Sequence, residues 1–249
     1  MLLMIDLWFK TSGTWINVIT IILGTVTGLL LRGRLPLRMQ KIIIQATGLV
    51  TLFVSMQMAT SLLKVKAGLI DGVVLAVILL ATGGLLGEWW QLEKRLESLG
   101  DWLKAKFRGG GKFTEGFVAA SLLFCIGPMA IIGSLNNGLT GDNTLLVLKA
   151  LMDGLIAIAF TSSFGIGVGF SSLSVVFYQG SLSLLAGTLA QVLPNPAQAP
   201  PVLVITGVGG LMLLGLGLNL LEVATIQVAS FLPSLLLAPL FYFIASRFG

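Results

Sequence analysis

The chain has 249 residues, of which 56% are hydrophobic and only 10% are charged, and its mean hydropathy is +1.00. Because soluble domains carry roughly 25% charged residues, this composition excludes a soluble globular protein and predicts an integral membrane protein. Histidine is absent, which removes the commonest metal ligand and general base, and the single cysteine excludes an internal disulfide. We therefore expect no enzyme, no metal site and no cofactor. The net charge of +5 lies beside apolar runs, which favours contact with membrane lipids and argues against nucleic acid as a partner.

Eight apolar runs, each long enough to span a bilayer, follow one another along the chain. They cover about residues 15–31, 42–63, 69–87, 116–133, 145–170, 173–190, 201–221 and 224–246. The predicted fold class is all-α, a polytopic transmembrane helix bundle of about eight spans in a single domain, 1–249. The connection between the fifth and sixth runs, Ser171-Ser172, is so short that these runs can also be read as one broken helix.

Positive charge on two connecting segments predicts the orientation of the chain. The loop at 32–41 carries four basic residues and no acid. Within 88–114, large apolar side chains recur at helical spacing among lysines and arginines, which predicts an amphipathic interfacial helix followed by a basic linker. Both segments are expected in the cytoplasm by the positive-inside rule. The turn at 134–144 and the uncharged loop at 191–200 are then expected outside.

A weak internal repeat divides the chain. Leu35-Pro36 corresponds to Leu193-Pro194, Thr47-Gly48 to Thr206-Gly207, and Leu62-Leu63 to Leu220-Leu221, at an offset of 158 or 159. This offset covers five spans, an odd number, so the two copies must cross the membrane in opposite directions. The predicted division is repeat one at 15–87, the interfacial segment at 88–114, a central pair at 115–170 and repeat two at 171–249. Opposed repeats are typical of secondary transporters, although apolar spans also resemble one another by chance.

Asp153 is the strongest candidate for a site residue, because an acid within an apolar span is costly and marks a functional site by default. Lys149 lies four residues earlier and shares a helix face with it. One interpretation makes Asp153 a cation ligand or proton carrier with Lys149 as its charge partner. The other makes the two residues a self-neutralised pair that extends toward the outer interface.

Other polar groups within the apolar runs are expected near Asp153. The candidates for a solute or ion site are Asn17, Ser162, Ser163 and Gln179. Asn17 can equally form an interhelical hydrogen bond, and the serines lie beside glycines that favour close helix packing. Gly127-Pro128 predicts a helix break in the fourth span, because proline removes one backbone hydrogen bond.

Several of these motifs together resemble an uncharacterised bacterial family. They are TWINVITIILGTVTGLLL near the start, FTEGFVAASLLFCIGPMAIIGSLNNGLTGD, Lys149 with Asp153-Gly154, GIGVGFSS and YQGSLSLLAG. The resemblance, over nearly the whole chain, is to the domain-of-unknown-function 554 (YqgA-like) family. It implies a multi-pass protein of the bacterial inner membrane and supplies no substrate.

Two functions remain open from the sequence. The first is a secondary transporter or ion-conducting protein for a small solute or monovalent cation, with a polar site near the bilayer midplane. The second is a structural or regulatory membrane protein that acts through helix assembly alone. The pairs Gly24/Gly28 and Gly83/Gly87 permit close helix contact, within a subunit or between subunits. On this basis a homo-oligomer is expected.

Overall fold

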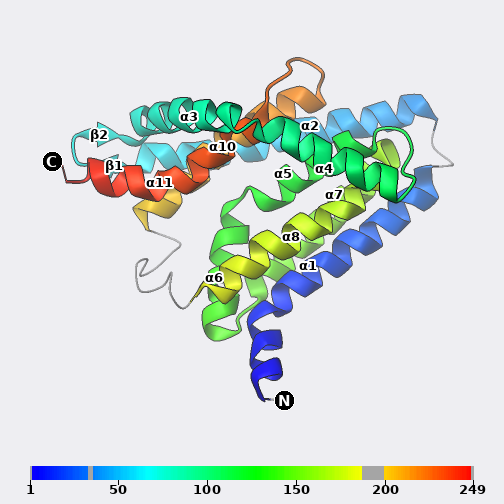
Figure 1. Ribbon diagram of the computed structural model, residues 1–249, viewed down its shortest axis with the longest axis horizontal. Helices are drawn as coiled ribbons and strands as arrows, with labels where there is room; N and C mark the ends of the chain where they lie inside the picture. Colours follow the sequence, from blue (N-terminus) through cyan, green and yellow to red (C-terminus); the bar gives the residue numbers. More distant parts are fainter. Residues whose placement is uncertain (1, 33–35, 187–198, 248–249) are drawn as a thin grey trace. The chain divides into compact units, whose positions relative to one another are not determined.

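The computed structural model describes residues 2–32, 36–186 and 199–247, and most of them are helical (Figure 1). The helices in chain order are α1 (Leu2–Arg32), α2 (Leu37–Ala59), α3 (Gly72–Trp89), α4 (Leu92–Lys106), α5 (Phe113–Cys125), α6 (Pro128–Thr140), α7 (Thr144–Phe164), α8 (Gly167–Leu184), α10 (Pro200–Leu220) and α11 (Leu232–Ala245). The shorter elements are the 3₁₀ helices η1 (Thr60–Lys64) and η2 (Val228–Phe231) and the antiparallel strands β1 (Lys66–Ala67) and β2 (Ile70–Asp71). The all-α prediction is confirmed apart from this small hairpin.

The chain forms two compact units. Unit 1 is Met1–Thr47, Leu99–Cys125 and Met129–Pro196, and unit 2 is Gly48–Ser98, Ile126–Pro128 and Ala197–Gly249. In unit 1, α1 packs along α7, and α8 packs against both α1 and α5. In unit 2, α11 packs against α3 and α10. The expected repeats do not coincide with these units, because repeat one contributes α1 to unit 1 and α3 to unit 2.

Six helices among the described residues are long and apolar enough to cross a membrane, and α5 with α6 makes a seventh if this bent pair is one span. The helix α8 is not among them, because Gln179 and several serines lower its apolar character. These polar side chains are buried: Ser171, Gln179 and Ser183 are at most 1% exposed. A count of eight spans therefore requires that α8 also cross the bilayer.

Several predicted boundaries differ from the structure. The helix α1 begins at Leu2, well before the expected start at residue 15. The expected connection at Ser171-Ser172 lies inside α8, and the chain instead turns at Gly165, whose φ of +89° strongly favours glycine. The Asn-Asn-Gly sequence expected in a turn belongs to α6, which continues to Thr140. At Gly127 and Pro128, where a helix break was expected, α5 and α6 meet at 61°. Most of the expected outer loop, 191–200, falls outside the described residues.

Glycines bring α1 and α7 into close backbone contact. A Cβ at Gly24 would collide with the carbonyl oxygen of Gly154, and a Cβ at Gly28 would collide with that of Ile158. On the other unit, Gly83 and Gly87 lie against Ser234 and Ser230 in the same way. Both predicted glycine pairs are thus buried in contacts within the chain.

We expect Gly24→Ala to destabilise unit 1 by about 1–3 kcal/mol, because the added methyl group must push the backbones of α1 and α7 apart. Thermal unfolding in detergent measures the effect. Gly180→Ala is the matched control: it is also a helical glycine, but a Cβ there meets nothing within 4 Å. It should be neutral or slightly stabilising, since alanine is the better helix former by about 1 kcal/mol. Equal losses in both variants would contradict the packing argument.

A second prediction concerns Glu93 of α4, whose carboxylate accepts a hydrogen bond from the Ala229 backbone N–H at 2.7 Å. Burial raises the pKa of this carboxyl above its ordinary value of 4.5, against the lowering effect of that hydrogen bond. A raised folded pKa means that the contribution to stability is present below pH 4.5 and is lost as pH rises through the folded value. Hydrogen exchange at η2, corrected for intrinsic rates, should therefore quicken with rising pH. In Glu93→Gln this excess pH dependence should disappear.

Candidate functional site

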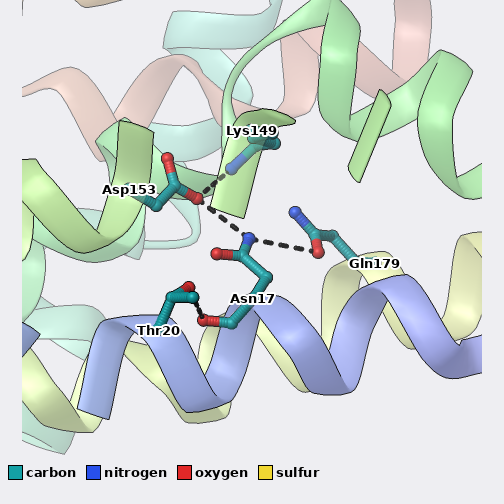
Figure 2. Close-up of polar contacts among 5 residues, drawn as sticks. All are labelled: Asn17, Thr20, Lys149, Asp153 and Gln179. Carbon is teal, nitrogen blue, oxygen red and sulfur yellow. Dashed lines mark hydrogen bonds and ion pairs between the residues drawn. The ribbon is translucent and has the colours of Figure 1, made fainter. Parts of the chain in front are cut away.

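Four polar side chains from three helices of unit 1 meet in its interior (Figure 2). Asn17 comes from α1, Lys149 and Asp153 from α7, and Gln179 from α8. Asn17 and Gln179 are 0% exposed, and Lys149 and Asp153 are each 6% exposed. Charged and amide side chains are rarely buried to this degree unless they bind one another or a ligand. These four residues are called the polar cluster below.

Asp153 is the centre of the polar cluster. Its Oδ2 atom forms an ion pair with Lys149 Nζ one helical turn away and accepts a hydrogen bond from Asn17 Nδ2 at 2.9 Å. The same Asn17 amide donates to Gln179 Oε1 at 3.3 Å. Asn17 therefore lies between the carboxylate and Gln179 and joins all three helices.

The charge on Asp153 determines how both amides are oriented. An ionised carboxylate can only accept hydrogen bonds, so Asn17 must present its NH₂ group to Asp153. The second hydrogen of that group then requires Gln179 to present its oxygen. This leaves Asn17 Oδ1, an acceptor, and Gln179 Nε2, a donor, buried without a partner among the described residues. An unsatisfied buried polar group costs about 1–3 kcal/mol, so this pair of atoms calls for an explanation.

Phe124 and Thr20 lie next to the polar cluster. The ring of Phe124 on α5 lies with its centroid 6.0 Å from Lys149 Nζ. Thr20, one turn beyond Asn17, uses its hydroxyl to bond the Asn17 backbone carbonyl at 2.8 Å and leaves the amide side chain to its other partners. The close approach of α1 and α7 at Gly24 and Gly154 is what allows Asn17 to reach Asp153. The cluster has no net charge, because Lys149 neutralises Asp153.

The structure does not bring Ser162 and Ser163 to the polar cluster. They lie nine and ten residues beyond Asp153 on α7, which is about 13–15 Å along the helix axis. Ser162 donates to the Ala159 carbonyl at 2.7 Å, and Ser163 donates to the Gln40 carbonyl at 3.1 Å. Gly127 and Pro128 form the α5–α6 break and belong to unit 2. The prediction that these two serines lie near Asp153 was thus wrong. Residues of one long apolar run can lie more than two helical turns apart along the helix axis.

Asn137 is a polar residue of α6 that the sequence reading missed. Its Oδ1 accepts the backbone N–H of Gly13 at 3.0 Å, and its Nδ2 donates to the Phe9 carbonyl at 3.0 Å. In a regular helix the Gly13 N–H would donate to the Phe9 carbonyl, because these residues are an i, i+4 pair of α1. The Asn137 amide bonds both of these backbone groups. Side chains inserted in this way bend helices, and α1 changes direction near its N-terminal end (Figure 1). The only signal in the sequence was an asparagine within an apolar helical pattern.

A metal centre has no support in the part of the chain that the structure describes. Within 2–32, 36–186 and 199–247, no three His, Cys, Asp or Glu side chains are grouped so as to hold a metal ion. What the polar cluster can do chemically is bind: it offers one ion pair, one spare acceptor and one spare donor in an apolar environment.

A double-mutant cycle tests how tightly Lys149 and Asp153 depend on each other. Each single variant, Lys149→Met or Asp153→Asn, should be destabilised by about 3–5 kcal/mol, because the remaining buried charge loses its partner. The double variant should recover most of this loss. Reversible unfolding in detergent measures the free energy of unfolding of the parent, the two single variants and the double variant. Additive losses would show that the two charges do not interact.

Comparison with known proteins matches nearly the whole chain to one family. The family model described as "Protein of unknown function (DUF554)" matches residues 12–243. "Uncharacterized membrane protein YdfK" of Bacillus subtilis (strain 168) is 33% identical over 237 residues, which are 95% of this chain and 98% of that protein. "Uncharacterized protein YqgA" of Escherichia coli (strain K12) is 33% identical over 233 residues, 91% and 94% of the two chains. No solved structure matches. The chain is a multi-pass membrane protein, and it belongs to the DUF554 family.

Proposed function

We propose that this protein is a secondary transporter or ion-conducting protein of the bacterial inner membrane, and that the polar cluster is its solute site. The observation that carries the proposal is the spare acceptor and spare donor, Asn17 Oδ1 and Gln179 Nε2, buried beside an ion pair. A purely structural ion pair needs no such atoms. A polar solute would give both of them a hydrogen-bond partner.

The cost of the polar cluster supports this function. Ionisable residues within membrane spans are expensive, and they commonly mark substrate or ion pathways. Replacing a buried ion pair by apolar residues of similar volume is often neutral or stabilising. The Lys149–Asp153 pair is therefore poorly explained by stability alone. In the proposed cycle Lys149 holds Asp153 ionised while the site is empty, and an entering solute competes with Lys149 for the carboxylate.

The packing of matched helices supports opposed repeats. Under the 158–159 offset, α1 corresponds to α8, α2 with η1 to α10, and α3 to α11. In unit 2, Gly48 lies against Leu221 and Gly217 against Leu52, so α2 and α10 are antiparallel; Gly83 and Gly87 lie against Ser234 and Ser230, so α3 and α11 are antiparallel as well. In unit 1, Asn17 meets Gln179 and Thr25 meets Gly169, which makes α1 and α8 antiparallel too.

Each helix of repeat one thus packs antiparallel against its counterpart in repeat two. A two-fold axis in the membrane plane requires such opposed directions. On this proposal the polar cluster joins the first helix of each repeat to α7 of the central pair. Eight crossings result when α8 and the bent α5–α6 pair are each counted with the six apolar helices. The basic residues of 32–41 and 88–114 then lie in the cytoplasm.

The assembly-only alternative relied on the amphipathic helix and on the glycine faces. The pairs Gly24/Gly28 and Gly83/Gly87 are both taken up by contacts within the chain, which leaves this alternative the amphipathic helix. A homo-oligomer stays a prediction that would need a different surface. The proposed function includes no enzymatic step.

Flux measurements in reconstituted vesicles test the proposed function. Uptake of a panel of small cations, amino acids and other polar solutes should be saturable for at least one solute. The double variant Lys149→Met/Asp153→Asn should abolish that uptake, at least a hundred-fold, because it removes the carboxylate while leaving no buried charge unpaired. The double variant is preferred to Asp153→Asn alone, which leaves Lys149 buried without a counter-ion.

Ser162→Ala is the matched control, because Ser162 lies on the same helix and its hydroxyl donates to the Ala159 carbonyl of that helix. Its uptake should equal that of the parent. If the folded double variant transports like the parent, the polar cluster is structural and the proposed function is wrong. Absence of saturable uptake across the whole panel would count equally against it.

A further inference from the structure

A groove of about 540 Å³ lies on unit 1 between the N-terminal half of α1 and the C-terminal half of α8. Its walls are mainly large apolar side chains, and several of them are well exposed: Trp8 is 59% and Phe177 76% accessible. The lining residues are Leu7, Trp8, Thr11, Thr14, Trp15, Val176, Phe177, Gly180, Ser181 and Leu184. The groove is large enough for a small organic molecule and open on one side.

The inner wall of the groove is formed by the same two helices, α1 and α8, that carry Asn17 and Gln179 of the polar cluster. Thr14, which lines the groove, is 2% exposed, and its hydroxyl has no partner among the described residues. Thr14 precedes Asn17 by three residues, about 4.5 Å along the helix axis. Gly180, on the facing helix, directly follows Gln179. Asn17 and Gln179 do not line the groove themselves; Thr14 and Gly180 are lining residues that lie close to them along α1 and α8.

Gly180 keeps this inner wall open. A Cβ added there meets no atom within 4 Å, so the space beside it belongs to the groove. A side chain at this position begins in open space, and a longer one is expected to extend into the groove. This allows the groove to be filled while the polar cluster stays intact.

The charge balance of the polar cluster restricts the solute. Lys149 and Asp153 already neutralise each other, so a bare cation or anion would add an uncompensated charge in a low-dielectric environment. A zwitterion adds none. Its ammonium group can bond Asn17 Oδ1 and share Asp153, while its carboxylate can accept from Gln179 Nε2 and share Lys149. Each unpaired atom then gains the partner that it lacks.

We propose that the solute is a small zwitterion with an apolar body, which has the chemistry of an apolar amino acid. Its apolar part lies in the groove between α1 and α8, and its charged ends bind the polar cluster with Thr14 as an additional hydrogen-bond partner. This inference rests on the proposed function and deepens it by naming the substrate class and the apolar subsite. A lipid acyl chain would match the apolar walls but would leave all three polar atoms unpaired.

Tryptophan fluorescence measures occupancy of the groove directly, because Trp8 and Trp15 line it. The other tryptophans are removed as Trp89→Phe, Trp90→Phe and Trp102→Phe. The first probe is leucine, a zwitterion with an apolar body. Two probes keep this body but carry one charge each: 3-methylbutylamine has only the amine, and 4-methylpentanoate has only the carboxylate. The fourth probe, glycine, is a zwitterion without the apolar body. Leucine should give a saturable change and bind at least ten-fold more tightly than each of the other three.

Variants then locate the binding. Gly180→Leu should reduce leucine affinity at least ten-fold with an unchanged unfolding temperature, and Thr14→Val should reduce it several-fold. Gly110→Leu is the matched control: Gly110 also meets nothing within 4 Å but lies in the basic linker, so leucine binding should be unchanged.

The outcomes separate this inference from the proposed function. Equal binding of leucine and 3-methylbutylamine would contradict the proposal that the solute is a zwitterion. Leucine binding that Gly180→Leu leaves unchanged would contradict the assignment of the groove as its apolar subsite. Quenching of Trp8 and Trp15 by brominated lipid that leucine does not relieve would assign the groove to a lipid chain. In each of these cases, vesicle uptake of another solute that still requires Lys149 and Asp153 would leave the proposed function standing.

Discussion

The structure of unit 1 depends on one constraint: polar groups buried in an apolar interior need partners. Asn17 satisfies Asp153 and Gln179 at once, and it can do so only because Gly24 and Gly154 let the backbones of α1 and α7 approach closely. Asp153 in turn is neutralised by Lys149 from the preceding turn of α7. The small and polar residues of α1 therefore act together. The glycines allow a short distance between α1 and α7, and this distance lets the Asn17 amide reach Asp153.

The same constraint explains α8. Its serines and Gln179 lower its apolar character, yet Ser171, Ser183 and Gln179 are buried, and α8 packs against α1 and α5. A helix of this composition is poorly suited to contact with lipid, but it is well suited to line a polar site within a bundle. Packing against neighbours supplies the hydrogen-bond partners that the bilayer lacks. The place of α8 within unit 1 thus reflects its packing against α1 and α5, while its own hydropathy falls short of that of the six candidate spans.

The charge balance of the polar cluster differs from that of an isolated buried carboxylate. An isolated buried carboxylate would attract a cation, whereas the Lys149–Asp153 pair is already neutral and leaves only one spare acceptor and one spare donor. Net-neutral dipolar solutes fit such a site at the lowest electrostatic cost. Our proposal assigns the apolar part of the solute to the groove that Thr14 and Gly180 line. The proposed zwitterionic solute thus rests on two observations, the polar cluster and the apolar groove.

The sequence by itself determined the membrane class, the helical fold, the family and the pairing of Lys149 with Asp153. These follow from local composition and from spacing along one helix. Asn17 and Gln179 were foreseen as candidates only because amides are costly within apolar runs. Tertiary structure alone decided that both meet Asp153 and that Ser162 and Ser163 do not, because contacts between helices depend on their register, which apolar periodicity leaves open. The contacts of Asn137 and the groove could not be predicted from the sequence for the same reason. Each involves two helices whose residues lie far apart in the chain.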